Sequence, residues 1–246
     1  MFNSDVVNET ILTFLWLEDR EGKSSYTFWK TLIDIILPNA IVESKKNNSE
    51  LVKAVKHLKD KESIYIIVYD NSFDNFQVYQ EQKRLKNYVD EKENVKMLDI
   101  ICFEYILLEF ELLIEWLYES DDEFLIKRMD VINARDKLVK TIKSGDMNYK
   151  AVKEIIEYDS KLERHNIEQL AAKLLYDLTR NTGFETTKKK IGECWIKSCC
   201  QWGDRQDDDC CGLDHNRLTI ADKMKLIYEK TSLKKEFSRI GLEVKE

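Results

Sequence analysis

Two acidic residues, Glu18 and Asp70, each stand at the end of a short apolar run. Glu18 ends the run Ile11–Glu18, and Asp70 follows the run Ser63–Tyr69, with Asp74 four residues further along. In open α/β sheets, ligands bind beyond the carboxyl ends of the strands, so acids at two such ends can share one site. Carboxylates that meet there repel each other, and a divalent cation with a preference for oxygen relieves the repulsion and can assist attack on a phosphate. We therefore take these three acids as candidate catalytic residues and as candidate ligands of Mg²⁺ or Mn²⁺.

The same acids also have a purely structural interpretation. Strands often end in a charged residue because the chain emerges into water at that point. Asp74 stands near the start of a predicted helix, where the helix dipole favours a carboxylate. The pattern alone leaves both interpretations open.

Two further residues could support such a site. Lys23 follows the first apolar run and could contact a phosphate from the loop, although an exposed lysine is usually just solvated. Glu104 lies between two aromatic residues at the start of an apolar helical segment. It could face the site, cap that helix, or pair with a buried base.

The cysteines are distributed unevenly. Cys102 stands alone, whereas the other five lie between residues 194 and 211. In a reducing compartment such a cluster is more often metal-binding than disulfide-bonded. We predict a structural Zn²⁺ held by Cys194, Cys199, Cys210 and Cys211. The spacing lacks a Cys-x-x-Cys pair, so packed thiols or a redox pair remain alternatives.

Apolar runs alternate with segments of helical periodicity over the first half of the chain. The predicted strands are Ile11–Glu18, Ala40–Glu43, Ser63–Tyr69 and Val95–Ile101. The predicted helices are Tyr26–Leu37, a second helix capped by Asn48 or Ser49, Phe76–Asp90 and Phe103–Tyr118. This alternation predicts an α/β fold with a mostly parallel sheet flanked by helices.

After Tyr118 the pattern is mainly helical. The predicted helices there are Phe124–Lys143, Tyr149–Glu157, Ile167–Thr179 and Thr219–Thr231. The Cys-rich segment lies between the last two of them. We therefore expect an α/β domain over residues 1–118 and a helical, Cys-containing C-terminal domain over residues 119–246.

The order of acids resembles the TOPRIM domain, and is closest to that of the RloB-like and OLD-type nucleases of bacterial defence. The segment Leu17–Tyr26 (LEDREGKSSY) resembles the first motif of the family, with Glu18 as its acid. Tyr65–Ser72 (YIIVYDNS) resembles the second motif, and Cys102–Glu104 resembles a Cys-Phe-Glu element that follows the last strand. The likeness covers residues 10–118.

The chain departs from the family at two points. Glu21-Gly22 also looks like the family's Glu-Gly pair, but Glu21 lies three residues into the loop, so we prefer Glu18. The second motif is usually Asp-x-Asp, and here the second acid is replaced by Ser72. Serine can hold a metal-bound water but brings no charge, so Asp74 would have to substitute for the missing acid.

The resemblance implies a Mg-dependent nuclease that hydrolyses phosphodiester bonds of DNA or RNA in an anti-phage defence system. It also implies a protein partner, such as a defence-system ATPase or sensor. The alternative is a catalytically inactive TOPRIM-like binding, sensor or inhibitor subunit, which Ser72 and the net charge of −7 favour.

Charge and hydrophobicity along the chain bear on nucleic-acid binding and on the expected location of the protein. A net charge of −7 argues against a surface that binds nucleic acid throughout, but it permits a local basic cleft. Acids interrupt every apolar stretch well short of the ~20 residues that span a bilayer. The first five residues lack the basic and apolar regions of a signal peptide, so we expect a cytoplasmic protein.

Overall fold

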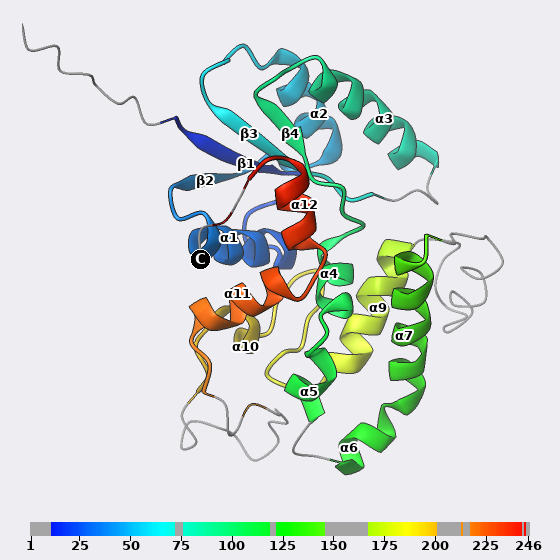
Figure 1. Ribbon diagram of the computed structural model, residues 1–246. Helices are drawn as coiled ribbons and strands as arrows, with labels where there is room; N and C mark the ends of the chain where they lie inside the picture. The colour runs from blue at the N-terminus through cyan, green and yellow to red at the C-terminus, as the bar shows by residue number, and fades with distance from the viewer. Residues whose placement is uncertain are drawn as a thin grey trace, which may run out of the picture.

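The computed structural model describes residues 11–71, 76–118, 122–145, 167–200, 213, 217–242 and 244. Its centre is a four-stranded, all-parallel sheet with the strand order β2-β1-β3-β4 (Figure 1). The strands are β1 (Thr13–Leu17), β2 (Ala40–Ser44), β3 (Ile64–Val68) and β4 (Val95–Met97). The predicted α/β fold with a mostly parallel sheet is confirmed.

The register brings the strand ends to one edge of the sheet. Leu17, the last residue of β1, lies opposite Ser44 of β2 and Val68 of β3. The residues that follow these strands therefore emerge side by side. This arrangement places Glu18 and Asp70 on neighbouring strands at the carboxyl edge.

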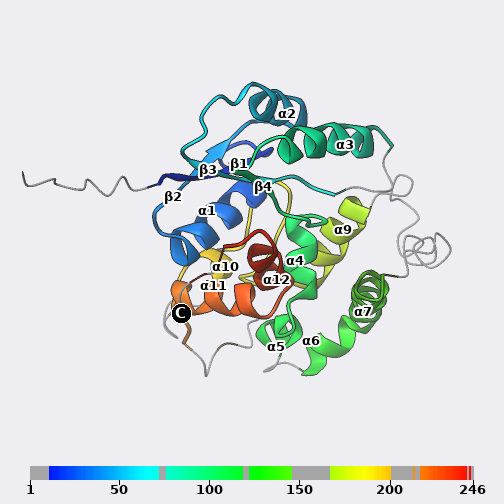
Figure 2. The ribbon, with the colours of Figure 1, turned by 45° about the horizontal axis from the view of Figure 1, so that its top comes forward.

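Helices cover both faces of the sheet (Figure 2). One face carries α2 (Asn48–His57) and α3 (Phe76–Asp90), which pack over Trp16, Ile67 and Tyr69. The other face carries α1 (Ser24–Ile36) and α4 (Phe103–Glu109). Because both faces are covered, the strands read as nearly continuous apolar runs rather than as alternating ones.

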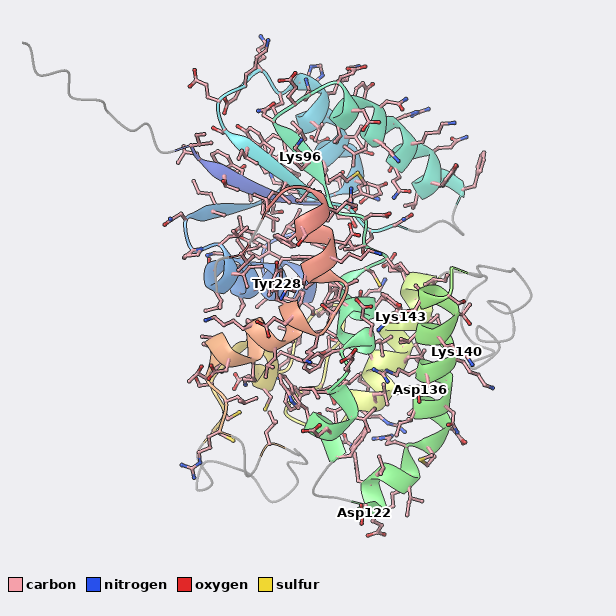
Figure 3. The ribbon with its side chains drawn as sticks, viewed as in Figure 1. Lys96, Asp122, Asp136, Lys140, Lys143 and Tyr228 are labelled. Carbon is pink, nitrogen blue, oxygen red and sulfur yellow. The ribbon has the colours of Figure 1, made fainter. Side chains whose placement is uncertain are left out.

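The C-terminal half adds helices below the α1 face of the sheet (Figure 1). They are α5 (Leu113–Tyr118), α6 (Asp122–Lys127), α7 (Met129–Lys143), α9 (Ile167–Thr179), α10 (Glu193–Ile196), α11 (Ile220–Glu229) and α12 (Leu233–Arg239). One continuous hydrophobic core runs from Leu15 of β1 to Phe237 of α12. Within it the ring of Tyr228, labelled in Figure 3, packs against Phe237 with ring centroids 5.8 Å apart.

The single helix predicted over Phe103–Tyr118 is interrupted, so that prediction was wrong in detail. The backbone of Phe110 is extended, with φ −57° and ψ 119°. The guanidinium of Arg135 donates to the carbonyl of Leu108 at 2.6 Å and to that of Phe110 at 3.0 Å. These bonds satisfy carbonyls at the end of α4 that a continuous helix would have used.

Other boundaries also differ from the prediction. The predicted helix Phe124–Lys143 divides at Arg128, whose guanidinium stacks over the ring of Phe124 at 4.9 Å. The side chain of Asn47, not Asn48 or Ser49, caps α2. The strand predicted over Val95–Ile101 ends at Met97.

Helix α12 was not predicted at all. It is held against the end of β4, where Arg239 donates to the carbonyl of Met97 at 2.8 Å and Glu236 accepts from the backbone of Asp99 at 3.0 Å. The predicted helix Tyr149–Glu157 lies outside the described residues. Among the residues that are described, no helix has the length and apolar composition of a membrane span.

Candidate active site

A cleft of ≈390 Å³ opens at the carboxyl edge of the sheet. It combines an acidic group of side chains with a basic group, and both the sheet region and the C-terminal helices contribute to it. The lining residues are Glu18, Asp19, Arg20, Lys23, Ser25, Lys46, Asn47, Asn48, Asp70, Phe103, Glu104, Glu168 and Lys188. The predicted site residues Glu18, Lys23, Asp70 and Glu104 are therefore brought together.

Glu18 follows β1 directly and points into this cleft. The Oε2 oxygen is buried and has no hydrogen-bond partner among the described residues. Burial, followed by repulsion from Asp19, raises the pKa of Glu18 from 4.5 to about 8. The nearby backbone N–H of Asp70 favours the ionised carboxylate and partly opposes the rise in the pKa of Glu18. An unpaired buried carboxylate oxygen is costly, and a proton or a cation would satisfy it.

Asp70 follows β3 and lies beside Glu18. A parallel bridge to Ile100 and hydrogen bonds from the Asn71 N–H to the carbonyls of Ile100 and Ile101 hold this turn in place. Burial raises the pKa of Asp70 well above its usual value, and the charges of Glu18 and Glu104 add to the shift. The three acids therefore repel one another within one cleft.

Glu104 approaches from the first turn of α4 and is only 5% exposed. Its pKa is raised from 4.5 to about 8, mainly by burial and in smaller part by the nearby charge of Glu168. The Cys102 thiol favours the ionised carboxylate of Glu104 and opposes part of this rise. Burial and the charge of Glu104 hold the pKa of the Cys102 thiol well above its usual range, so Cys102 stays a neutral thiol.

The sequence prediction missed two residues from the C-terminal half. The Lys188 Nζ lies 3.1 Å from the Oε1 oxygen of Glu168, which stands in the first turn of α9. The hydroxyl of Ser24, at the start of α1, donates to the carbonyl of Thr187 and so ties this loop to the cleft. Nothing in the sequence distinguishes Lys188 from its neighbours Lys189 and Lys190.

The basic residues that line the cleft are Arg20, Lys23, Lys46 and Lys188. Lys46 adopts a left-handed backbone with φ 72°, an uncommon conformation for a residue with a side chain. Its N–H donates to the Ser44 hydroxyl at 3.1 Å, and that hydroxyl donates to the carbonyl of Asp19 at 2.6 Å. This chain of bonds connects the ends of β2 and β1.

Asp19 was also missed as a lining residue. It follows Glu18 in the chain, and Ser25 lines the cleft with it. Burial raises its pKa, while Lys188 and Lys23 oppose that shift. The cleft thus holds more negative charge than the motif residues alone predicted.

The remaining predicted support residues divide into two groups. Glu21 is exposed and does not line the cleft, whereas Glu18 does. Ser72 and Asp74 lie outside the described residues.

The donor set of the cleft suits a hard divalent cation, because Glu18, Asp70 and Glu104 offer carboxylate oxygens and one of these is unpaired. Within the described part of the chain, no three His, Cys, Asp or Glu side chains already form a group that could hold a metal ion. A complete site would therefore need a further ligand, and Asp74 is the predicted one.

The cysteine prediction is only partly covered by the structure. Cys194 and Cys199 are partly buried against the main core, and Cys200 is exposed. The Cys194 sulfur packs against Gly183, where a Cβ atom would lie 2.3 Å from it. Cys210 and Cys211 lie outside the described residues, so the zinc site stays a prediction.

We compared the chain with protein-family models, with curated proteins and with solved structures, and none of them matches it significantly. The function is therefore inferred from the cleft and from the motifs that line it.

Proposed function

We propose that this chain is a divalent-cation-dependent nuclease of the TOPRIM type that hydrolyses phosphodiester bonds in DNA or RNA. One observation carries the proposal. Glu18, Asp70 and Glu104 come from three separate parts of the chain and line one cleft at the carboxyl edge of a parallel sheet, together with four basic side chains. The place of the protein in anti-phage defence follows from the motif resemblance and stays a prediction.

The chain's own residues suit the chemistry. Glu18 would either accept a proton from the attacking water or hold the cation, while Asp70 and Asp74 would hold the cation. The cation would neutralise charge on the phosphate and acidify the water. Lys188, Lys23 and Arg20 line the same cleft and can contact the phosphate oxygens. Hydrolysis leaves a terminal phosphate on one strand end and a hydroxyl on the other.

The test is cleavage of end-labelled DNA and RNA by the full chain in Mg²⁺ or Mn²⁺. We expect Glu18→Gln and Asp70→Asn each to reduce the rate at least ~100-fold, a loss typical for the removal of a general base. Glu21→Gln is the matched control because Glu21 is an exposed acid of the same loop outside the cleft, and it should cleave like the wild type.

The opposite outcomes are equally clear. Equal cleavage by the wild type, Glu18→Gln and Asp70→Asn would remove these acids from the mechanism. Nucleic-acid binding without cleavage in either cation would favour the inactive binding subunit instead.

A further inference from the structure

Helix α3 has two different faces. Its inner face buries Leu85 and Val89 against the sheet. Its first turn exposes two aromatic rings, because Phe76 is 72% exposed and Tyr79 is 48% exposed. Exposed rings of this size cost hydration free energy, and their spacing of three residues places them one helical turn apart.

Basic residues follow the two rings along the same face of α3. Phe76, Tyr79, Lys83 and Lys86 follow one another at spacings of three, four and three residues, so they form one stripe on the helix, which we call the α3 stripe. Lys83 and Lys86 are exposed, as is Arg84 beside them. At ~1.5 Å per residue the stripe is about 15 Å long, which is the reach of two or three nucleotides. It is a local basic surface on a chain with a net charge of −7.

The stripe begins next to the cleft. Asn48, which lines the cleft, donates from Nδ2 to the Tyr69 hydroxyl at 3.2 Å, and this hydroxyl donates to the carbonyl of Val78 at 3.4 Å. Val78 lies between Phe76 and Tyr79 in the chain. Figures 1 and 2 both show the first turns of α3 and α9 on the same side of the molecule, and α9 supplies Glu168 to the cleft.

We propose that the α3 stripe binds single-stranded nucleic acid and leads it into the cleft, an inference that rests on the proposed nuclease function. Phe76 and Tyr79 would stack on two bases, while Lys83 and Lys86 would contact the phosphates that follow. A ring can stack only on an accessible base face, and neighbouring pairs cover both faces inside a duplex. The substrate class is therefore single-stranded DNA or RNA, or an unpaired loop.

Binding can be measured separately from cleavage. The full chain is titrated in EDTA into a fluorescein-labelled oligonucleotide, either single-stranded oligo-dT, single-stranded oligo-U or a blunt duplex of equal length, and anisotropy is recorded. We expect the wild type to bind the single strands at least ~10-fold more tightly than the duplex, since each stacked base contributes about that factor or more.

Two double variants divide the stripe into its parts. Phe76→Ala/Tyr79→Ala should weaken single-strand binding at least ~10-fold and change duplex binding less than about twofold. Lys83→Gln/Lys86→Gln should weaken binding to both and lower the log–log salt slope of the binding constant by about 1.4 for the single strands and about 1.8 for the DNA duplex. All four side chains are exposed, so melting temperatures should stay at the wild-type value.

The matched controls lie on other surfaces. Ile126→Ala removes an apolar side chain that is 69% exposed on α6, and Lys234→Gln/Lys235→Gln removes two exposed lysines from α12. Both should bind like the wild type. Equal affinity of the wild type for single strand and duplex, or unchanged binding by Phe76→Ala/Tyr79→Ala, would overturn the inference.

The cleavage assay distinguishes the two proposals. Cation-dependent cleavage without a single-strand preference would refute the α3 stripe and leave the nuclease standing. Stripe-dependent binding of single strands, with no cleavage in Mg²⁺ or Mn²⁺, would refute the nuclease and leave the stripe.

Discussion

Glu18 and Asp70 follow the adjacent parallel strands β1 and β3 and line the same cleft, although they lie far apart in the sequence. Burial raises the pKa of Asp70 well above its usual value, and the charge of Glu18 adds to that rise. The protein thus concentrates negative charge that a cation or protons must offset.

The first prediction concerns this repulsion. Asp70→Asn and Glu18→Gln should each give a free energy of unfolding at pH 8 that is equal to that of the wild type or higher, by up to about 1 kcal/mol. The reason is that each substitution removes a buried charge. Urea denaturation without divalent ions measures this. Mn²⁺ should raise the melting temperature of the wild type but not that of Asp70→Asn. A destabilised Glu18→Gln would mean that this carboxylate makes stabilising contacts instead.

The second prediction is a pH dependence of stability. Burial raises the pKa of Glu18 and of Glu104 from 4.5 to about 8, so the folded chain keeps protons that the unfolded chain has lost. Their contribution to the free energy of unfolding is full below pH 4.5 and falls as the pH rises to about 8. The slope is up to ~1.4 kcal/mol per pH unit for each group.

Denaturation between pH 5.5 and 8.5 tests this fall. Glu18→Gln and Glu104→Gln should each flatten it, whereas Glu21→Gln should not. A wild-type stability that rises steadily across that range would contradict the raised pKa values.

The third prediction assigns Lys188 a role in phosphate binding. Lys188→Gln should lower the cleavage rate at least ~10-fold, because it removes a cation from the cleft, a change typically worth several times RT. Lys188→Arg should restore part of that rate. The neighbouring Lys189 does not line the cleft, so Lys189→Gln is the matched control. Equal losses in Lys188→Gln and Lys189→Gln would point to a diffuse charge effect.

The fourth prediction concerns the break between α4 and α5. Arg135→Ala should lower the free energy of unfolding by about 1–3 kcal/mol, because the carbonyl of Leu108 loses its Arg135 donor and that of Phe110 keeps only the N–H of Leu113. Thermal denaturation followed by circular dichroism measures the loss. Asp136, the exposed ion-pair partner of Arg135, provides the control. Asp136→Asn should cost under ~1 kcal/mol, and a larger cost there would assign the stabilisation to the ion pair.

The fifth prediction concerns the proposed zinc site of the C-terminal cysteines. Protein purified without chelator should contain close to one Zn²⁺ per chain, and chelation should open new protease sites among the C-terminal residues while the sheet region stays intact. Elemental analysis with limited proteolysis provides both measurements. Cys194→Ser/Cys199→Ser should lose the metal, whereas Cys102→Ser should keep it. If the wild type contained far less than one zinc ion per chain, the cysteines would be packed thiols and not zinc ligands.

Sequence patterns predicted the elements whose contacts repeat regularly along the chain. The apolar runs of β1 and β3 and the periodicity of α3 and α9 were sufficient because burial against a sheet or helix imposes a fixed spacing. The strand-end positions of Glu18 and Asp70 followed from the same runs. The parallel orientation of the strands followed from their alternation with helices.

Only the tertiary structure decided the rest of the site. Glu168 and Lys188 reach the cleft because the C-terminal helices share one core with the sheet, and no local pattern encodes a contact with a residue so distant in the sequence. The end of α4 likewise depends on Arg135 of α7. Its guanidinium donates to the carbonyls of Leu108 and Phe110, where a continuous helix would have used backbone N–H groups. Local spacing specifies the elements because each residue there interacts mainly with near neighbours and solvent. The contents of the cleft depend on how those elements pack, since burial and charge at one residue come from all of its surroundings.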